Sequence, residues 1–318
     1  MQIKYGLIDN NIDVTSICNE RCKYGNFIVI PAFDYVRCVF FTDPLPNVLK
    51  SIFVVNDDQE NDSRYAGESS NVQEYDFTHT IIIGTINHQI TTLQHPYPHV
   101  NFYAKLVEIQ NQLQIRHGSF SEEFPEQLMS VRYFTGKEKV LELGGNIGRN
   151  SLIIASILQH HNNFDLVTLE SDPNTVTLLT ENRDVNNLQF HIEGSALSNR
   201  KLMQNAWTTL PINNVETDLL EEYTLINTIT YQELQQKYNI QFDTLVLDCE
   251  GAFYYILQDM PEILENIKLI VMENDYLNLT HKQYIDDVLK QNGFYVDYVE
   301  SGGWGQCYTN FYEVWKRF

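Results

Sequence analysis

The sequence predicts an α/β protein with a mostly parallel sheet, preceded by a small all-β module. From about residue 101, continuous apolar runs alternate with segments of helical spacing. Strands that are apolar on both faces are covered by helices on both sides, as in a doubly wound sheet. Before residue 100, short β-rich segments are separated by turn signals, which is typical of a small β module.

Composition disfavours several classes of partner. The 318 residues carry 42 acidic and 21 basic side chains, a formal net charge of -21, so the chain repels phosphate backbones and nucleic acid is disfavoured. No apolar run reaches the roughly 18 residues of a membrane-spanning helix and no signal segment is found, which predicts a cytoplasmic protein without membrane contact. We expect the five scattered cysteines to be reduced, and Cys18 and Cys22 lack the second Cys/His pair of a zinc site, so no metal is predicted.

Residues 1–100 are expected to form an accessory domain. Strands are predicted at four segments and a hairpin at a fifth, namely 2–8, 25–31, 35–41, 51–55 and 79–93. The acidic segment 56–77 has few aliphatic side chains to bury, which predicts a mobile loop. His88, His95 and His99 fit neither one helix face nor one strand face, so we interpret them as solvated loop histidines. Pro96 and Pro98 indicate a domain boundary near residue 100.

Residues 101–318 are expected to form the second domain. Apolar residues at 102, 106, 109 and 113 predict its first helix. Asp172-Pro173 combines an N-cap with proline at the first helical position, which predicts a helix start. Strands are predicted at 139–143, 166–170, 189–194, 243–248, 268–273, 294–300 and 309–315, and helices at 149–159, 174–185, 231–238, 261–267 and 282–292. The last two strands form an antiparallel pair, and a polar excursion spans 198–228.

A glycine turn, Gly144-Gly145-Asn146-Ile147-Gly148, follows the first strand of this domain and predicts a ligand site. Such turns let a ligand approach the backbone, beside the free N–H groups of the next helix. The turn ends Gly148-Arg149-Asn150, so it lacks the Lys-Ser/Thr of a P-loop, and it fits a dinucleotide motif only loosely. Glu142 in the strand before it would repel a pyrophosphate and attract an amine or a sulfonium.

Glu170 ends the second strand, 28 residues after Glu142. That spacing corresponds to one strand, helix and strand, so we expect both carboxylates to reach the same crevice. A carboxylate at the second position commonly accepts hydrogen bonds from ribose hydroxyls. The alternative, two solvated surface glutamates, fits poorly because both follow apolar strand residues.

Four motifs in order resemble those of the class I S-adenosylmethionine-dependent methyltransferases, and within them the FkbM-like family. They are Glu142-Leu-Gly-Gly-Asn-Ile-Gly148, Leu169-Glu-Ser-Asp-Pro173, Ser195-Ala-Leu-Ser198 and Asp243-Thr-Leu-Val-Leu-Asp-Cys-Glu-Gly251. The resemblance covers about residues 101 to 318. It implies a Rossmann-like seven-stranded sheet with an antiparallel last strand, methyltransferase activity and S-adenosyl-L-methionine as the cofactor.

The resemblance also implies roles for individual residues. Those around the methionine part of the cofactor would be Glu142, Gly144, Gly145, Asn146 and Gly148. Glu170 would hold the ribose, Ser171 would border the adenine, and Ser195 with Ala196 would line its edge. Arg116, His117 and Ser119 are further candidates for the cofactor carboxylate. The sequence departs from many relatives, which carry Asp in place of Glu142 and Ala in place of Gly145; the longer Glu142 is still expected to reach the cofactor amine.

Asp248 and Glu250 follow the fourth strand and are the predicted catalytic residues. Methyl transfer is an in-line displacement, so the enzyme positions an acceptor atom and removes its proton. Alternate strand residues share one face, so both carboxylates would face the crevice unless the turn into Gly251 has begun. The alternative for the pair is an acidic strand end that caps the next helix. Further acceptor candidates are Glu273, Asp275, His281 and Trp304.

The predicted acceptor is a sugar hydroxyl, in a nucleotide sugar or a glycan. No lysine accompanies Asp248-Cys-Glu-Gly251, unlike the Lys-Asp-Lys-Glu tetrad of messenger-RNA ribose methyltransferases, and FkbM-like relatives are mostly O-methyltransferases. The chain also looks similar to methyltransferases of giant DNA viruses that modify surface glycans, which would place it in the host cytoplasm. Another small molecule, RNA, or a non-catalytic cofactor-binding scaffold remain the alternatives, and the oligomeric state stays open, a homodimer included.

Overall fold

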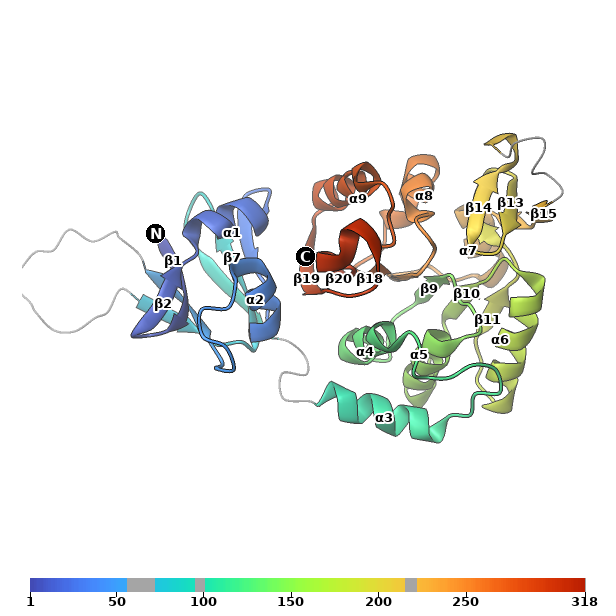
Figure 1. Ribbon diagram of the computed structural model, residues 1–318, viewed down its shortest axis with the longest axis horizontal. Helices are drawn as coiled ribbons and strands as arrows, with labels where there is room; N and C mark the ends of the chain where they lie inside the picture. Colours follow the sequence, from blue (N-terminus) through green and yellow to red (C-terminus); the bar gives the residue numbers. More distant parts are fainter. Residues whose placement is uncertain (56–71, 95–100, 215–221, 318) are drawn as a thin grey trace, which may run out of the picture.

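The computed structural model describes residues 1–55, 72–94, 101–214 and 222–317 (Figure 1). Within these residues one large sheet has the strand order β11-β10-β9-β17-β18-β20-β19. Its strands are β9 (Val140–Leu143), β10 (Leu166–Leu169), β11 (His191–Glu193), β17 (Thr244–Leu247), β18 (Leu269–Glu273), β19 (Phe294–Glu300) and β20 (Tyr312–Arg317). The last strand, β20, runs antiparallel to both of its neighbours. The predicted fold class, a Rossmann-like seven-stranded methyltransferase sheet with an antiparallel last strand, is confirmed.

Helices cover both faces of this sheet, as the continuous apolar runs predict. Figure 1 shows α4, α5 and α6 on one side and α8 and α9 on the other. The helices of this domain are α3 (Phe102–Gln112), α4 (Phe124–Tyr133), α5 (Arg149–His160), α6 (Pro173–Val185), α7 (Tyr231–Tyr238), α8 (Phe253–Asp259) and α9 (Leu279–Gln291), with 3-10 turns at Pro261–Leu264 and Gly305–Asn310. The sequence prediction missed α4 and α8. No helix among the described residues is long and apolar enough to cross a membrane.

Local sequence accounts for how these elements begin. The strand β9 is buried at all four residues, as expected for a strand that is apolar on both faces. Asp172 caps α6 as predicted, because its side chain accepts a hydrogen bond from the backbone N–H of Thr175 at 2.7 Å. Thr230 and Glu233 form a capping box at the start of α7.

The polar excursion 198–228 contains a small sheet of its own. Its strands are β13 (Leu202–Asn205), β14 (Thr208–Pro211) and β15 (Thr224–Ile226), in the order β14-β13-β15. A short parallel pair, β12 (Ala196–Leu197) and β16 (Thr228–Ile229), leads into and out of it. The hairpin between β13 and β14 turns through Ala206, at a φ of 49°, and Trp207.

The N-terminal module contains two antiparallel sheets within its described residues, with the orders β2-β1-β5-β6 and β3-β4-β7-β8. Their strands are β1 (Gln2–Leu7), β2 (Asn10–Asp13), β3 (Lys23–Tyr24), β4 (Phe27–Ile30), β5 (Ser51–Val55), β6 (Val72–Tyr75), β7 (His79–Gly84) and β8 (Ile90–Gln94). The predicted hairpin over 79–93 is confirmed as β7 and β8.

Two helices in the module correct the sequence prediction. These are α1 (Thr15–Arg21) and α2 (Asp34–Phe41), and α2 occupies the segment 35–41 that was predicted to be a strand. Its aromatic and β-branched residues favour a strand locally, yet Asp34, Arg37 and Phe41 are buried at helical spacing. The predicted loop 56–77 is also corrected in part, because 72–75 form β6; its remainder up to residue 71 lies outside the described residues.

The module packs against the large sheet at β19. Asp297 of β19 is 1% exposed and accepts hydrogen bonds from the Thr80 hydroxyl of the module at 3.0 Å and from the Tyr133 hydroxyl of α4 at 2.9 Å. The Arg132 guanidinium lies over the rings of Phe33 in the module and Tyr298 in β19, at 5.7 and 4.4 Å from the ring centroids. Apolar module residues therefore join the hydrophobic core of the large sheet. The boundary predicted near residue 100 falls at residues 95–100, outside the described ranges.

Candidate functional site

A cavity of about 680 Å³ lies at the carboxyl ends of β9, β10, β17 and β18. This is the edge at which open α/β sheets bind their ligands. Its wall includes the ends of those strands, α8 and the β13–β14 hairpin of the small sheet. Of the predicted site residues, those that line it are Gly144, Asn146, Glu170, Ser171, Ser195, Ala196, Asp248, Glu250, Glu273, Asp275 and His281.

Gly144 and Gly148 occupy positions in the glycine turn that leave no room for a side chain. Gly144 has a φ of +87° and Gly148 a φ of +95°, a region that favours glycine. A Cβ at Gly144 would overlap the backbone carbonyl oxygen of Asp248, and a Cβ at Gly148 would overlap Leu179. The backbone of the turn after β9 therefore lies directly against the backbone of the turn after β17.

Glu142 lies behind this turn and does not line the cavity, which corrects the prediction that it reaches the crevice. It is the third residue of β9 and not the last, so its side chain points toward α5. Its carboxylate accepts hydrogen bonds from the hydroxyls of Ser151 at 2.5 Å and Thr168 at 2.7 Å. Burial raises the pKa of Glu142 to about 7, while these two hydrogen bonds act in the opposite direction.

Thr168 also explains why residue 145 is glycine. A Cβ at Gly145 would overlap the Thr168 methyl group, so an alanine does not fit at this position. The same threonine holds Glu142 through its hydroxyl. The side chain of Thr168 therefore constrains both residue 145 and Glu142.

Glu170 is placed at the cavity by the turn after β10. One carboxylate oxygen accepts from the backbone N–H of Asn146 and the other from that of Asp172, both at 2.9 Å. Burial raises the pKa of Glu170, and these backbone hydrogen bonds lower it. The backbone N–H of Ser171 is a third donor, so three of the roughly four lone-pair sites of this carboxylate are engaged. Glu170 thus joins the two turns and can still accept from a ligand.

The neighbouring hydroxyls have partners within the fold. Ser171 donates to the side-chain oxygen of Gln204 on β13 at 2.8 Å, which ties the small sheet to the turn after β10. Ser195 donates to the carboxylate of Glu193 at 2.9 Å. Ala196 begins β12 and lines the cavity beside Ser195.

Asp248 and Glu250 both line the cavity, although the turn has already begun. β17 ends at Leu247, and Glu250 has a left-handed backbone conformation with a φ of 49°. The alternation of side chains along a strand therefore does not explain why Asp248 and Glu250 both face the cavity. Burial raises the pKa of Asp248 well above its usual range, and the negative charges of Glu123 and Glu126 raise it further.

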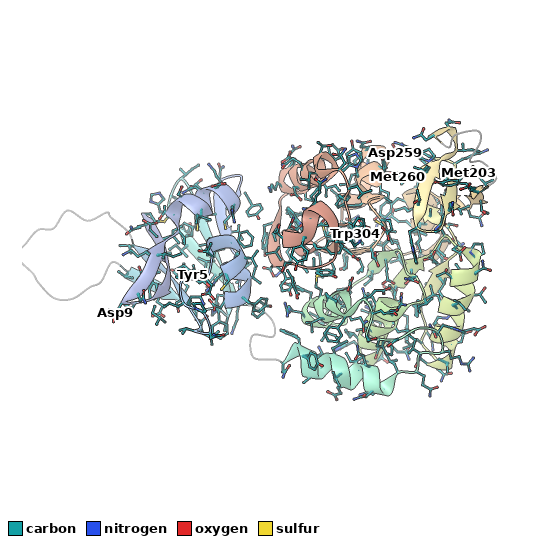
Figure 2. All side chains as sticks on the ribbon, viewed as in Figure 1. Tyr5, Asp9, Met203, Asp259, Met260 and Trp304 are labelled. Carbon is teal, nitrogen blue, oxygen red and sulfur yellow. The ribbon has the colours of Figure 1, made fainter. Side chains whose placement is uncertain are left out.

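Among the predicted acceptor residues, Trp304 lies elsewhere. It precedes the 3-10 turn Gly305–Asn310, is 49% exposed and is not part of the cavity lining; Figure 2 labels it beside that turn. Glu273 ends β18 and Asp275 follows it at the cavity. His281 lines the cavity from the first turn of α9, where its ring stacks on Tyr254 with centroids 3.7 Å apart.

Arg116, His117 and Ser119 do not line the cavity. The backbone N–H groups of Arg116 and His117 donate to the side-chain oxygen of Asn182 on α6. The His117 ring contacts Glu181 at 2.8 Å. This segment therefore packs on α6 rather than facing a ligand.

The sequence prediction missed four lining residues that decide the character of the site. Glu123 and Glu126 enter from the start of α4, a helix that the prediction lacked. Trp207, 66% exposed, reaches the cavity from the β13–β14 hairpin. The sequence did contain a signal for the start of α4, because Pro125 stands at a helix start and is followed by buried residues at helical spacing. Arg200 lines the cavity as well and pairs with Asp259 on α8, which Figure 2 labels.

The cavity is strongly acidic. Among the described lining residues, eight are Asp or Glu, namely Glu123, Glu126, Glu170, Asp248, Glu250, Asp259, Glu273 and Asp275, and Arg200 is the one Lys or Arg. Arg200 is already neutralised, since its Nε and Nη2 bond both carboxylate oxygens of Asp259 at 2.5 and 2.6 Å. The site therefore suits a positively charged ligand and repels phosphates.

No set of His, Cys, Asp and Glu within the described residues is arranged to hold a metal ion. Cys18 and Cys22 are buried free thiols in the module. His88 lies exposed in the turn between β7 and β8, in agreement with the interpretation as a loop histidine, while His95 and His99 lie outside the described residues.

No family model and no curated protein matches the sequence. Solved structures show a distant likeness. The methyltransferase FkbM from Methylobacillus flagellatus KT has a TM-score of 0.40 and 11% identity over 67% of this chain and 58% of its own. The Bacillus cereus O-methyltransferase in complex with SAH has a TM-score of 0.36 and 13% identity, over 69% and 90%. Aeropyrum pernix fibrillarin with bound S-adenosyl-L-methionine has a TM-score of 0.38 and 8% identity, over 75% and 93%.

Proposed function

We propose that this chain is an S-adenosylmethionine-dependent O-methyltransferase that acts on a sugar hydroxyl. The observation that carries the proposal is the acidic cavity at the switch edge of the sheet, with Glu170 at the tip of the second strand. A dinucleotide or nucleoside triphosphate would bring several negative charges to eight carboxylates. A nucleoside that carries a sulfonium and an ammonium group brings the opposite charge.

The residues present fit such a cofactor. Glu170 lines the cavity, where its carboxylate would accept a hydrogen bond from the ribose, and Ser171, Ser195 and Ala196 border the space beside it. Glu123 and Asp248 line the cavity next to Gly144 and provide carboxyl oxygens for the cationic end. Glu142 acts as a positioning residue, because it holds Thr168 and Ser151 behind the turn.

The bound cofactor would supply an electrophilic methyl group on a positively charged sulfur. The task of the chain is to hold an acceptor hydroxyl close by and to take its proton. Asp248 is poorly suited as the base, because burial and the neighbouring carboxylates of Glu123 and Glu126 raise its pKa and disfavour its ionised form. Glu250 lies less buried in the same turn and is the proposed base, with its carboxylate oxygen as the proton acceptor.

A sugar is favoured by the side chains around the acceptor half of the cavity. Carboxylates accept hydrogen bonds from hydroxyls, and Tyr255 on α8, 46% exposed, and the His281 ring add apolar faces. The same negative charge disfavours the diphosphate of a nucleotide sugar. A glycan or free sugar is therefore favoured over a nucleotide sugar, and the other small molecules and RNA become the alternatives in the test.

Titration calorimetry with S-adenosylhomocysteine tests the cofactor, and a tritium-methyl screen over glycans, nucleotide sugars, capped RNA and peptides tests the acceptor. Glu170→Ala should weaken cofactor affinity by at least about tenfold, the equivalent of 1.4 kcal/mol. Glu181→Gln, which removes an exposed carboxylate outside the cavity, is the matched control and should bind normally. Absence of binding by the wild-type protein would refute the cofactor, as expected of a scaffold, and label in RNA alone would refute the acceptor class.

A further inference from the structure

A group of three carboxylates lies on the acceptor side of the cavity and has no cation to balance it. We call Glu126, Glu273 and Asp275 the acidic subsite; Glu126 comes from α4, Glu273 from the end of β18 and Asp275 from the loop after it. Glu126 and Asp275 are each 7% exposed. In each, one carboxylate oxygen lacks a hydrogen-bond donor anywhere in the described residues. Buried oxygens without a donor are rare and costly.

The carboxyl groups of the acidic subsite contact other carboxyl groups. Glu273 hydrogen-bonds Asp248, and Asp275 hydrogen-bonds Glu250. Two carboxylates can share a hydrogen bond only when one of them holds a proton. Burial, together with the neighbouring negative charges, accordingly raises the pKa of Glu126 to about 7, of Asp275 to about 7 and of Glu273 to about 11. A positively charged ligand group would relieve the same repulsion between these carboxyl groups.

No positively charged side chain among the described residues balances the negative charge of the acidic subsite. Arg200 is paired with Asp259, and Arg149 is paired with Glu122 and Glu123. A metal ion is not favoured either, because no group of His, Cys, Asp and Glu among the described residues has a suitable arrangement. The missing positive charge is therefore expected on an organic ligand.

The cofactor does not account for this charge. Its nucleoside would extend from Glu170 toward Ser195, over β10 and β11, with its cationic end beside Gly144, Glu123 and Asp248. The acidic subsite lies past Asp248, on the β18 side. With one carboxylate of its own, the cofactor brings a net charge of only about +1 to this acidic cavity.

We propose, on the basis of the proposed function, that the acceptor carries an ammonium group next to the methylated hydroxyl, as in an amino sugar. Glu273 and Asp275 bind this group, and Glu126 lies behind them. A protonated amine donates up to three hydrogen bonds, which suits several carboxylate oxygens. Oxygen remains the methylated atom, because a protonated amine has no lone pair. The proton of the acceptor hydroxyl passes to Glu250. The carbon–sulfur bond breaks as the carbon–oxygen bond forms, and the sulfur keeps the electron pair.

Matched sugars that differ only in this charge test the proposal. Chitosan tetrasaccharide carries free ammonium groups, and its fully N-acetylated counterpart, chitin tetrasaccharide, is neutral; glucosamine and N-acetylglucosamine form a smaller pair. Affinities are measured by calorimetry with and without S-adenosylhomocysteine, and methyl transfer is measured on the same compounds. We expect each cationic member to bind at least about tenfold more tightly than its neutral partner.

Variants assign the effect to the acidic subsite. Asp275→Asn and Glu273→Gln should each reduce the preference for the cationic member and leave S-adenosylhomocysteine affinity unchanged. Loss of a like-charged neighbour favours folding, so these amides should remain folded. Asp287→Asn, an exposed position on α9, makes the same charge change outside the cavity and is the control.

The outcomes separate this proposal from the proposed function. Equal or tighter binding of the neutral members, or no binding of any cationic member, refutes the ammonium site, whether or not the cofactor binds. A preference that survives in both amide variants also refutes it, as does a preference for chitosan that appears only when Mg²⁺ is present. Failure of S-adenosylhomocysteine to bind refutes the proposed function instead, and it is measured in a separate titration.

Discussion

The α-carbon of Gly144 faces the backbone carbonyl oxygen of Asp248 so closely that a Cβ on residue 144 would overlap this oxygen. The turn after β9 and the turn after β17 are thereby locked together at the centre of the cavity. Gly144 also has a φ of +87°, which adds a conformational penalty for any other residue.

Gly144→Ala is therefore expected to destabilise the protein by about 3 kcal/mol or more and to abolish S-adenosylhomocysteine binding. Gly25→Ala is the matched control, because Gly25 has a φ of +58° but nothing within 4 Å of its added Cβ. This control should cost only about 1 kcal/mol. Urea unfolding measures both, and equal losses in the two variants would contradict the overlap.

The pH dependence of stability should report the buried carboxyl of Glu142. Its pKa rises from 4.5 to about 7 on burial, so the folded protein binds this proton more tightly than the unfolded chain does. Stability is then fully present at low pH and is lost as the pH rises from about 4.5 to about 7, by about 3 kcal/mol for this group.

Glu142→Gln should flatten this dependence and make the variant more stable than the wild type above pH 7. Urea unfolding at several pH values between 5 and 8 measures it. Glu108→Gln, exposed on α3, should keep the wild-type profile. An unchanged slope in Glu142→Gln would show that this carboxyl titrates normally.

The contact between the module and the large sheet should contribute measurably to stability through Asp297. Thr80→Val removes the hydroxyl that donates to this buried carboxylate, with little change in shape. The free energy of unfolding should fall by about 2 kcal/mol. Thr91→Val on the exposed face of β8 should change it by less than about 0.5 kcal/mol. If the free energy of unfolding of Thr80→Val equals that of the wild type, the module does not pack on β19 in solution.

Tryptophan fluorescence should respond to the cofactor through Trp207. This side chain lines the cavity next to Gln204 and the turn of Ser171, where the nucleoside is expected, whereas Trp304 does not line it. Addition of S-adenosylhomocysteine should change the emission of the wild type and of Trp304→Phe but not that of Trp207→Phe. Trp315, 1% exposed in β20, supplies a constant background. A response that follows Trp304 would reverse the assignment.

The elements that the sequence predicted correctly are those whose burial is set locally. The continuous apolar runs of β9, β10, β17 and β18 have no alternative to a sheet covered on both faces, and Asp172-Pro173 sets the start of α6 by capping. The segment 35–41 was predicted wrongly because its β-favouring residues form a helix that packs against β19, a contact distant in sequence.

The site was predictable in position, but the arrangement of its carboxyl groups was not. Motif spacing placed Glu170 and Asp248 at the cavity, since both follow parallel strands. It could not show that Glu142 turns back to Thr168, because that depends on which face of β9 it occupies. Nor could it show Glu126 beside Glu273, since two acids more than a hundred residues apart meet only when α4 packs near the end of β18.

The position of β20 between β18 and β19 has a consequence for biosynthesis. In the described sheet β19 is paired with β20 alone, yet β20 follows it along the chain, so a nascent chain that ends after β19 has no hydrogen-bonding partner for that strand. The N-terminal module, although synthesised before β19, docks on that strand through Thr80 and Asp297. Its docking surface is therefore complete only after β20 has left the ribosome, so the module is seated well after it is made.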